Sequence, residues 1–301
     1  GLTYSYWANI GATIPLSSPN AVNEGIYFIK ATNSTGCSSI AEVVVTALAL
    51  PTVTINSETI CEGDIATISA TTNPSGLYDY NWNVPSGATN PGNVATFTTS
   101  VSGNYAVFIT DQNAPYCAST TAIGTVTVNT LPTATISSSA TEVCLNTTVT
   151  ITFTGATGTA PYTFEYLDEN GATQTIVSAL DTATFTVPTN ADGIYNYKLV
   201  SGTDSSTTSC SQIQSGTESI TVRDLPIVDA GVSTLEVCAG EEITLSGSGA
   251  TTYIWNNGVI DGVPFTPIIT GTYTVTGTDS FGCENTDDII ITVLPAISGT
   301  I

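Results

Sequence analysis

The chain has 301 residues, of which three are basic and 25 acidic, so its formal net charge is −22. A surface of this charge disfavours nucleic acid and anionic lipid as partners, because proteins bind both through Lys and Arg. The chain has no histidine, which excludes a Ser-His-Asp or Cys-His nucleophile, and no apolar run approaches the roughly 18–20 residues that a membrane helix needs.

The dipeptide Leu-Pro divides the chain into repeats. It occurs at 50–51, 131–132, 225–226 and 294–295, at intervals of roughly 70 to 95 residues, which suits a small β-sandwich. The predicted organisation is the C-terminal part of an Ig-like repeat at 1–50, repeats at 51–131, 132–225 (with an insertion) and 226–294, and the start of the next at 295–301. We therefore expect the chain to be a segment of a longer protein.

Strand signals follow the same order in each repeat. A short strand after Leu-Pro is followed by a cysteine beside a turn, an alternating strand, a strand with an aromatic residue, a Gly-x-Tyr strand and a final alternating strand. Seven or so short strands without helical periodicity, and turns every 8–12 residues or so, predict an all-β fold of antiparallel sandwiches. Because Leu-Pro junctions leave no flexible spacer, we expect the sandwiches to be arranged end to end as a rod.

The clearest repeated stretch is GTYTVTGTDSFGC at 271–283, with copies at 25–37, 103–117 and 193–210. Its tyrosine is placed where a tyrosine corner would lie, with the hydroxyl bonded to backbone across the turn. The regular register of the aromatic residues predicts packing between the sheets. The expected core aromatics are Trp7, Trp82, Phe164, Trp255, Tyr27, Tyr105, Tyr195 and Tyr273.

These features resemble a known class of repeat. Leu-Pro junctions, Cys-x-Gly as at Cys61, a Trp strand and Gly-x-Tyr leading to Gly-Cys are similar to the tandem Ig-like/PKD-like repeats of Bacteroidota cell-surface proteins. Those proteins include giant gliding-motility adhesins and other type IX secretion cargo. PKD domains carry Gly-x-Asp after the Trp, whereas Trp255 is followed by Asn-Asn-Gly, so Ig-like is the better description. The resemblance covers essentially the whole chain and implies an extracellular location on a bacterial surface.

Seven cysteines recur at fixed places, without a CxxC pair, which indicates disulfides formed in an oxidising compartment. Within one sandwich the two cysteine positions are expected at opposite ends, some 40 Å apart at about 3.3 Å per residue, whereas a disulfide needs Cα atoms within about 7 Å. This geometry favours pairing across the junctions. The preferred scheme is Cys61–Cys210 and Cys144–Cys283, with Cys37, Cys117 and Cys238 pairing outside the chain; the open alternative is Cys61–Cys117, Cys144–Cys210 and Cys238–Cys283.

Acidic residues recur near the expected junctions. Hard oxygen ligands at such places could bind Ca²⁺ and stiffen the array, although no EF-hand loop is present. No other cofactor is expected. The candidate calcium ligands are Asp111, Asp204, Asp279, Glu62 and Glu241.

We expect a non-catalytic structural or adhesive region, a stalk or fibre, of a large secreted bacterial surface protein. Its expected partners are neighbouring repeats, copies of itself in a fibre, and surface polysaccharide or other cells. The alternatives are a glycan- or protein-binding region, for which Tyr78, Phe108 and Tyr116 are candidate contacts, and accessory repeats of a secreted enzyme. Fold similarity alone does not distinguish these roles.

Overall fold

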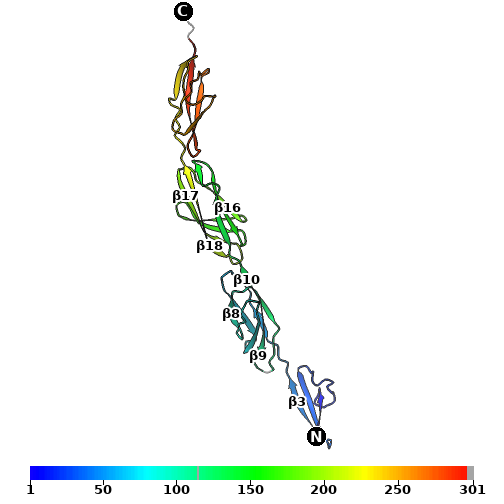
Figure 1. Cartoon of the computed structure of the whole chain (residues 1–301). Coiled ribbons are helices and arrows are strands. Elements are labelled where there is room, and N and C mark those ends of the chain that lie inside the picture. The colour runs from blue at the N-terminus through cyan, green and yellow to red at the C-terminus, as the bar shows by residue number, and fades with distance from the viewer. Residues whose placement is uncertain (114, 297–301) are drawn as a thin grey trace, which may run out of the picture. The chain divides into compact units, whose positions relative to one another are not determined.

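The computed structural model describes residues 1–113 and 115–296. The described residues form 22 strands and no helix, so the expected all-β fold is confirmed (Figure 1). None of their elements is a helix long and apolar enough to cross a membrane. The chain divides into two compact units, Gly1–Glu58 with Ile65–Thr127, and Thr59–Asp64 with Val128–Ile301.

Residues 2–45 form one antiparallel sheet of three strands, β1 (Leu2–Trp7), β2 (Gly25–Asn33) and β3 (Ser38–Val45). The Tyr27 hydroxyl donates to the Asn23 carbonyl at 3.0 Å, as expected for a tyrosine corner. Trp7 and Tyr27 are only half-buried, so the prediction that both are core residues is wrong. The described residues of this segment build a single sheet, and a single sheet cannot enclose side chains between two layers.

The segment after Pro51 contains two sheets. One has the strand order β4 (Thr52–Ile55), β6 (Ala66–Asn73), β8 (Thr96–Thr99); the other has β5 (Glu58–Cys61), β10 (Ala122–Asn129), β9 (Gly103–Asp111), β7 (Tyr78–Asn83). Trp82 and Tyr105 are buried, as predicted. The Trp82 ring meets Phe97 edge-on at 4.9 Å between centroids, and the Tyr105 hydroxyl donates to the Val101 carbonyl at 2.8 Å.

The segment after Pro132 also has two sheets and the largest aromatic core. Its strand orders are β11 (Thr133–Ser138), β13 (Val149–Ala156), β16 (Thr182–Val187), and β12 (Glu142–Cys144), β18 (Ser211–Arg223), β17 (Gly193–Thr203), β14 (Thr163–Leu167), β15 (Thr173–Val177). Strand β15 is an edge strand that pairs with β14. Phe164 is fully buried and stacks on Phe153. Tyr195 is half-buried against this core, with its hydroxyl on the Ala191 carbonyl, while Tyr197 takes the fully buried position.

The last segment forms one regular sheet, β19 (Thr234–Cys238), β22 (Glu284–Leu294), β21 (Gly271–Thr278), β20 (Thr252–Trp255). Trp255 and Tyr273 are buried in its core, as predicted. The strands expected near 227–230 and 243–247 appear only as the isolated bridges Asp229↔Ser248 and Ile243↔Phe265. Backbones approach very closely there: a Cβ on Gly249, whose φ is +86°, would lie 1.8 Å from the Ile227 carbonyl oxygen.

Three short strands, β5, β12 and β19, carry Cys61, Cys144 and Cys238 at their ends. Each lies beside the last strand of its own segment, and the β12–β18 and β19–β22 pairs are parallel. The sequence predicts only a turn at these cysteines. Strands of three to five residues show no readable alternation, and their partner lies far along the chain.

Candidate functional site: the cysteine junctions

Two disulfides join consecutive segments. Cys61 is bonded to Cys210 and Cys144 to Cys283, with Cα–Cα distances of 5.6 and 5.5 Å, normal for a disulfide. These are the pairs of the preferred scheme. The in-repeat pairs Cys61–Cys117, Cys144–Cys210 and Cys238–Cys283 are not formed, because each contains at least one cysteine that is bonded across a junction. Among the described residues, exposed Cys37 and Cys238 and half-buried Cys117 are free.

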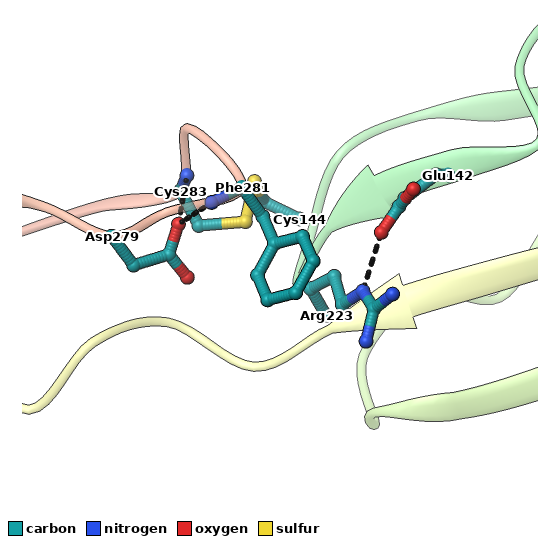
Figure 2. Close-up of polar contacts among 6 residues, drawn as sticks. All are labelled: Glu142, Cys144, Arg223, Asp279, Phe281 and Cys283. Atoms are coloured by element: carbon teal, nitrogen blue, oxygen red, sulfur yellow. Dashed lines mark hydrogen bonds and ion pairs between the residues drawn. A yellow bond between two sulfur atoms is a disulfide. The ribbon is translucent and has the colours of Figure 1, made fainter.

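An Asp or Asn closes the loop before each cysteine of the Gly-x-Tyr stretch. The backbone N–H of this residue donates to the cysteine carbonyl in all four loops, at 2.9–3.0 Å. Its side-chain oxygen accepts the cysteine N–H in three of them, at 2.8–2.9 Å. In the loop of Asp279, Oδ1 accepts both the Cys283 N–H and the Phe281 N–H (Figure 2). The pairs are Asn33 with Cys37, Asp111 with Cys117 (backbone bond only), Asp204 with Cys210, and Asp279 with Cys283.

Asp204 is the buried member of this set. Its carboxylate accepts the Cys210 N–H at 2.8 Å, the Thr159 N–H at 3.0 Å and the Ser206 hydroxyl at 2.7 Å. Burial alone would raise the pKa of Asp204, but these hydrogen bonds outweigh it and lower the pKa below its ordinary value. The ionised side chain therefore fixes the loop that presents Cys210 to Cys61.

Arg223, the last residue of β18, connects the two sides of the Cys144–Cys283 junction (Figure 2). Its Nε donates to Glu142 on β12, and its guanidinium carbon lies 4.1 Å from the centroid of the Phe281 ring. Both the Arg223 and Glu142 side chains are partly exposed, so each contact contributes only about 0–1 kcal/mol. Nothing in the sequence around Arg223 predicts this contact, although Arg223 is one of three basic residues and stands two before Leu-Pro.

The Cys61–Cys210 junction has an equivalent contact. Asn129, the last residue of β10, donates from Nδ2 to the Thr208 hydroxyl at 2.9 Å. Thr208 stands two residues before Cys210, as Phe281 stands two before Cys283. In both junctions, the residue that ends the last strand of one segment therefore touches the same loop position of the next.

The calcium candidates lie at these loops and turns. In the described part of the chain, no group of three or more Asp, Glu, His or Cys side chains lies close enough to hold a metal ion. Asp111, Asp204 and Asp279 accept loop hydrogen bonds, and Glu241 Oε2 accepts the Cys238 N–H at 3.0 Å. Glu62 donates its backbone N–H to the Asn129 carbonyl at 2.8 Å.

The aromatic candidates for glycan contact lie in different environments. Tyr78 is buried, with its hydroxyl on the Pro74 carbonyl, so it offers no exposed platform. Phe108 is 39% exposed beside a hollow of about 260 Å³ that Trp82 and Asn81 also line, and Tyr116 is 64% exposed. Of the three side chains, Phe108 lines this hollow, and Tyr78 and Tyr116 do not.

A second hollow, of about 460 Å³, lies between the β14–β15 turn and β17 and is lined by Asp168, Glu169, Tyr197 and Lys198. The buried Tyr197 hydroxyl has no hydrogen-bond partner among the residues that the structure describes. Burial and the nearby Glu169 carboxylate raise the pKa of Tyr197 well above its ordinary value. Hydrogen bonds from Gln174 and from the Ala172 N–H lower the pKa of Asp168, which closes the β14–β15 turn.

No protein-family model and no curated protein matches the chain. Among solved structures, an I-band fragment of titin is 14% identical and covers 82% of this chain and 100% of its own, with a TM-score of 0.49. An adhesin described as helping an Antarctic bacterium bind ice is 15% identical, with coverage of 97% and 90% and a TM-score of 0.44. A 1.5-MDa bacterial ice-binding adhesin is 17% identical, with coverage of 83% and 99% and a TM-score of 0.43. These are likenesses to tandem sandwich proteins in fold alone.

Proposed function

We propose that the chain is a non-catalytic structural region, a stalk or fibre segment, of a large secreted bacterial adhesin. The observation that carries this proposal is that both disulfides join consecutive segments. A sandwich that needed a bond only for its own stability would be stapled internally, whereas bonds between neighbours restrain the array. Disulfides also fit an extracellular location.

The resemblance to Bacteroidota repeats supports a role for such an adhesin as a gliding-motility or type IX secretion protein. Its partners would be neighbouring repeats, further copies in a fibre, and surface polysaccharide or other cells. Calcium at the junctions would add stiffness, with Asp and Glu oxygens as ligands. A glycan-binding role is the second candidate, because Phe108 is exposed beside a hollow that a sugar ring could enter.

The test removes residues 132–225 from the full-length protein in its own cell. A stalk segment predicts that the protein still reaches the surface and that its terminal domain keeps its binding activity, but lies closer to the cell, as measured by immunogold labelling. The matched test of the second candidate places the purified chain on a glycan array, with Phe108→Ala as control. Binding that Phe108→Ala abolishes would replace the stalk proposal with a recognition role.

A further inference from the structure

The last strand of a segment begins at a bonded cysteine. β18 starts directly after Cys210 and β22 directly after Cys283. Each of these cysteines is bonded to a cysteine of the preceding segment, Cys61 or Cys144. A pull on the preceding segment therefore reaches the first residue of the last strand through one disulfide.

The same strand ends beside the next bonded cysteine. Cys144 pairs with Arg223 in parallel register, and the N–H of the following Leu145 donates to the Arg223 carbonyl at 2.7 Å. The equivalent bonds run from Glu62 N to Asn129 O at 2.8 Å and from Ala239 N to Leu294 O at 2.9 Å. The first disulfide, the last strand and the next disulfide are thus connected in series. This connection runs beside the Leu-Pro junction and does not pass through it.

The two disulfide loops also overlap along the sequence. They enclose 149 and 139 residues of separation, and both contain the stretch from Cys144 to Cys210. Two overlapping loops do not shorten an unfolded chain additively, because the tension follows the shortest covalent route. When both bonds are present, the route from Cys61 to Cys283 contains only the stretch between Cys144 and Cys210. When either bond is missing, the route contains a stretch that is only slightly longer.

At about 3.4 Å per residue, the fully extended distance from Cys61 to Cys283 is on the order of 220 Å with both bonds. It is on the order of 250 Å without Cys144–Cys283, 280 Å without Cys61–Cys210, and 750 Å with neither. Either bond alone therefore preserves nearly the whole restraint. In-repeat bonds would not preserve the restraint in this way. Their loops would not overlap, so the loss of any one bond would add the full length of its loop to the extended chain.

We propose that the overlapping disulfides and the last strands form a continuous tether that carries tension past the Leu-Pro junctions, and that the limit this tether sets on the extension of the chain is nearly unchanged when either bond is lost. The tether would explain how the proposed stalk resists tension. Its biological use rests on the proposed stalk function, but its existence in the chain does not. A pulling measurement on the isolated chain tests the tether by itself, whereas the repeat-deletion experiment tests the stalk, so the two can fail separately.

The experiment stretches the 301-residue chain by its termini with optical tweezers in four forms: unchanged, Cys144→Ser with Cys283→Ser, Cys61→Ser with Cys210→Ser, and all four substitutions. Expected maximum extensions of the two single-bond forms exceed that of the unchanged chain by less than about 100 Å, and the four-Ser form exceeds it by about 500 Å. These lengths are covalent, so they hold even if a variant refolds poorly. A single-bond form that extends by several hundred ångströms more would overturn the proposal.

A second arm cuts the junction itself. A protease site inserted between Leu225 and Pro226 should leave the oxidised chain connected under tension after cleavage, because Cys144–Cys283 spans the cut. In the same chain with Cys144→Ser and Cys283→Ser, both cysteines of the remaining Cys61–Cys210 bond lie before the cut, so this tether should break on cleavage. An oxidised, unsubstituted tether that breaks on cleavage would show that the tension does not pass through the disulfide.

Discussion

Asp204 holds the loop before Cys210 through a buried carboxylate that accepts hydrogen bonds from Cys210, Thr159 and Ser206. Replacing it with Ala leaves buried N–H donors without acceptors, so we expect Asp204→Ala to lower the free energy of unfolding by about 1–3 kcal/mol. Urea denaturation of the purified chain measures this. Asp64→Ala, at an exposed acid, is the matched control and should change stability by less than about 0.5 kcal/mol.

The lowered pKa of Asp204 also predicts a pH dependence. A carboxylate whose pKa is lower in the folded than in the unfolded state stabilises the fold above its unfolded pKa of about 4, and this contribution is lost as the pH falls through the folded value. The melting temperature should therefore drop below about pH 4, and Asp204→Asn should flatten part of that drop. An unchanged slope in the Asn variant would mean that other carboxylates, such as Asp168 and Asp287, whose pKa values are also lowered, account for the acid sensitivity.

Arg223 and Phe281 offer a direct measurement of the contact across the Cys144–Cys283 junction. A guanidinium 4.1 Å from a partly exposed ring predicts a coupling energy of about 0.5–1 kcal/mol. The double-mutant cycle of Arg223→Ala and Phe281→Ala measures it by denaturant unfolding. Repeating the cycle in Glu142→Gln separates the ring contact from the ion pair; additive single effects would show that the stacked geometry contributes nothing.

At the scale of strands and sheets, a repeated aromatic position has different consequences in different segments. Trp82 lies between two sheets and is 7% exposed, whereas Trp7 occupies the related position on a single sheet and is half-buried. We expect Trp82→Ala to cost about 3–5 kcal/mol and Trp7→Ala well under half of that. Parallel unfolding curves of the two variants test this, and equal losses would contradict the one-sheet description of residues 2–45.

The short cysteine-bearing strands show why some strands cannot be predicted from the sequence. Strand β12 has three residues and β19 has five. The parallel partner of each strand lies more than fifty residues further along the chain. The Gly-x-Tyr strands are eight to eleven residues long, and β9, β17 and β21 alternate clearly, so they could be predicted. The length of a strand and the periodicity of its side chains therefore decided whether it could be predicted from the sequence.

For the whole molecule, the disulfides should supply stability as well as restraint. In the chain-entropy account, one loop of this length stabilises the fold by about 5 kcal/mol, and overlapping loops add less than twice that. A reducing agent should therefore strongly lower the denaturant midpoint of the unit formed by Thr59–Asp64 and Val128–Ile301. The triple variant Cys37→Ser, Cys117→Ser and Cys238→Ser is the control and should retain the unchanged midpoint under oxidising conditions; a loss of stability there would assign bonds to the free cysteines.

Local chemistry in the sequence determined the repeat, the all-β class, the tyrosine corners at Tyr27, Tyr105 and Tyr195, and the opposite ends at which the two kinds of cysteine had to lie. Those features depend on residues within one strand or turn, such as Gly-x-Tyr and the Asp or Asn in the loop before the cysteine that follows it. Only the tertiary structure decided that Arg223 meets Phe281, that Asp204 is buried while Asp111 is not, and that Trp7 lacks a covering sheet. Each of these depends on which distant strand ends come together, and no local pattern of side chains records that.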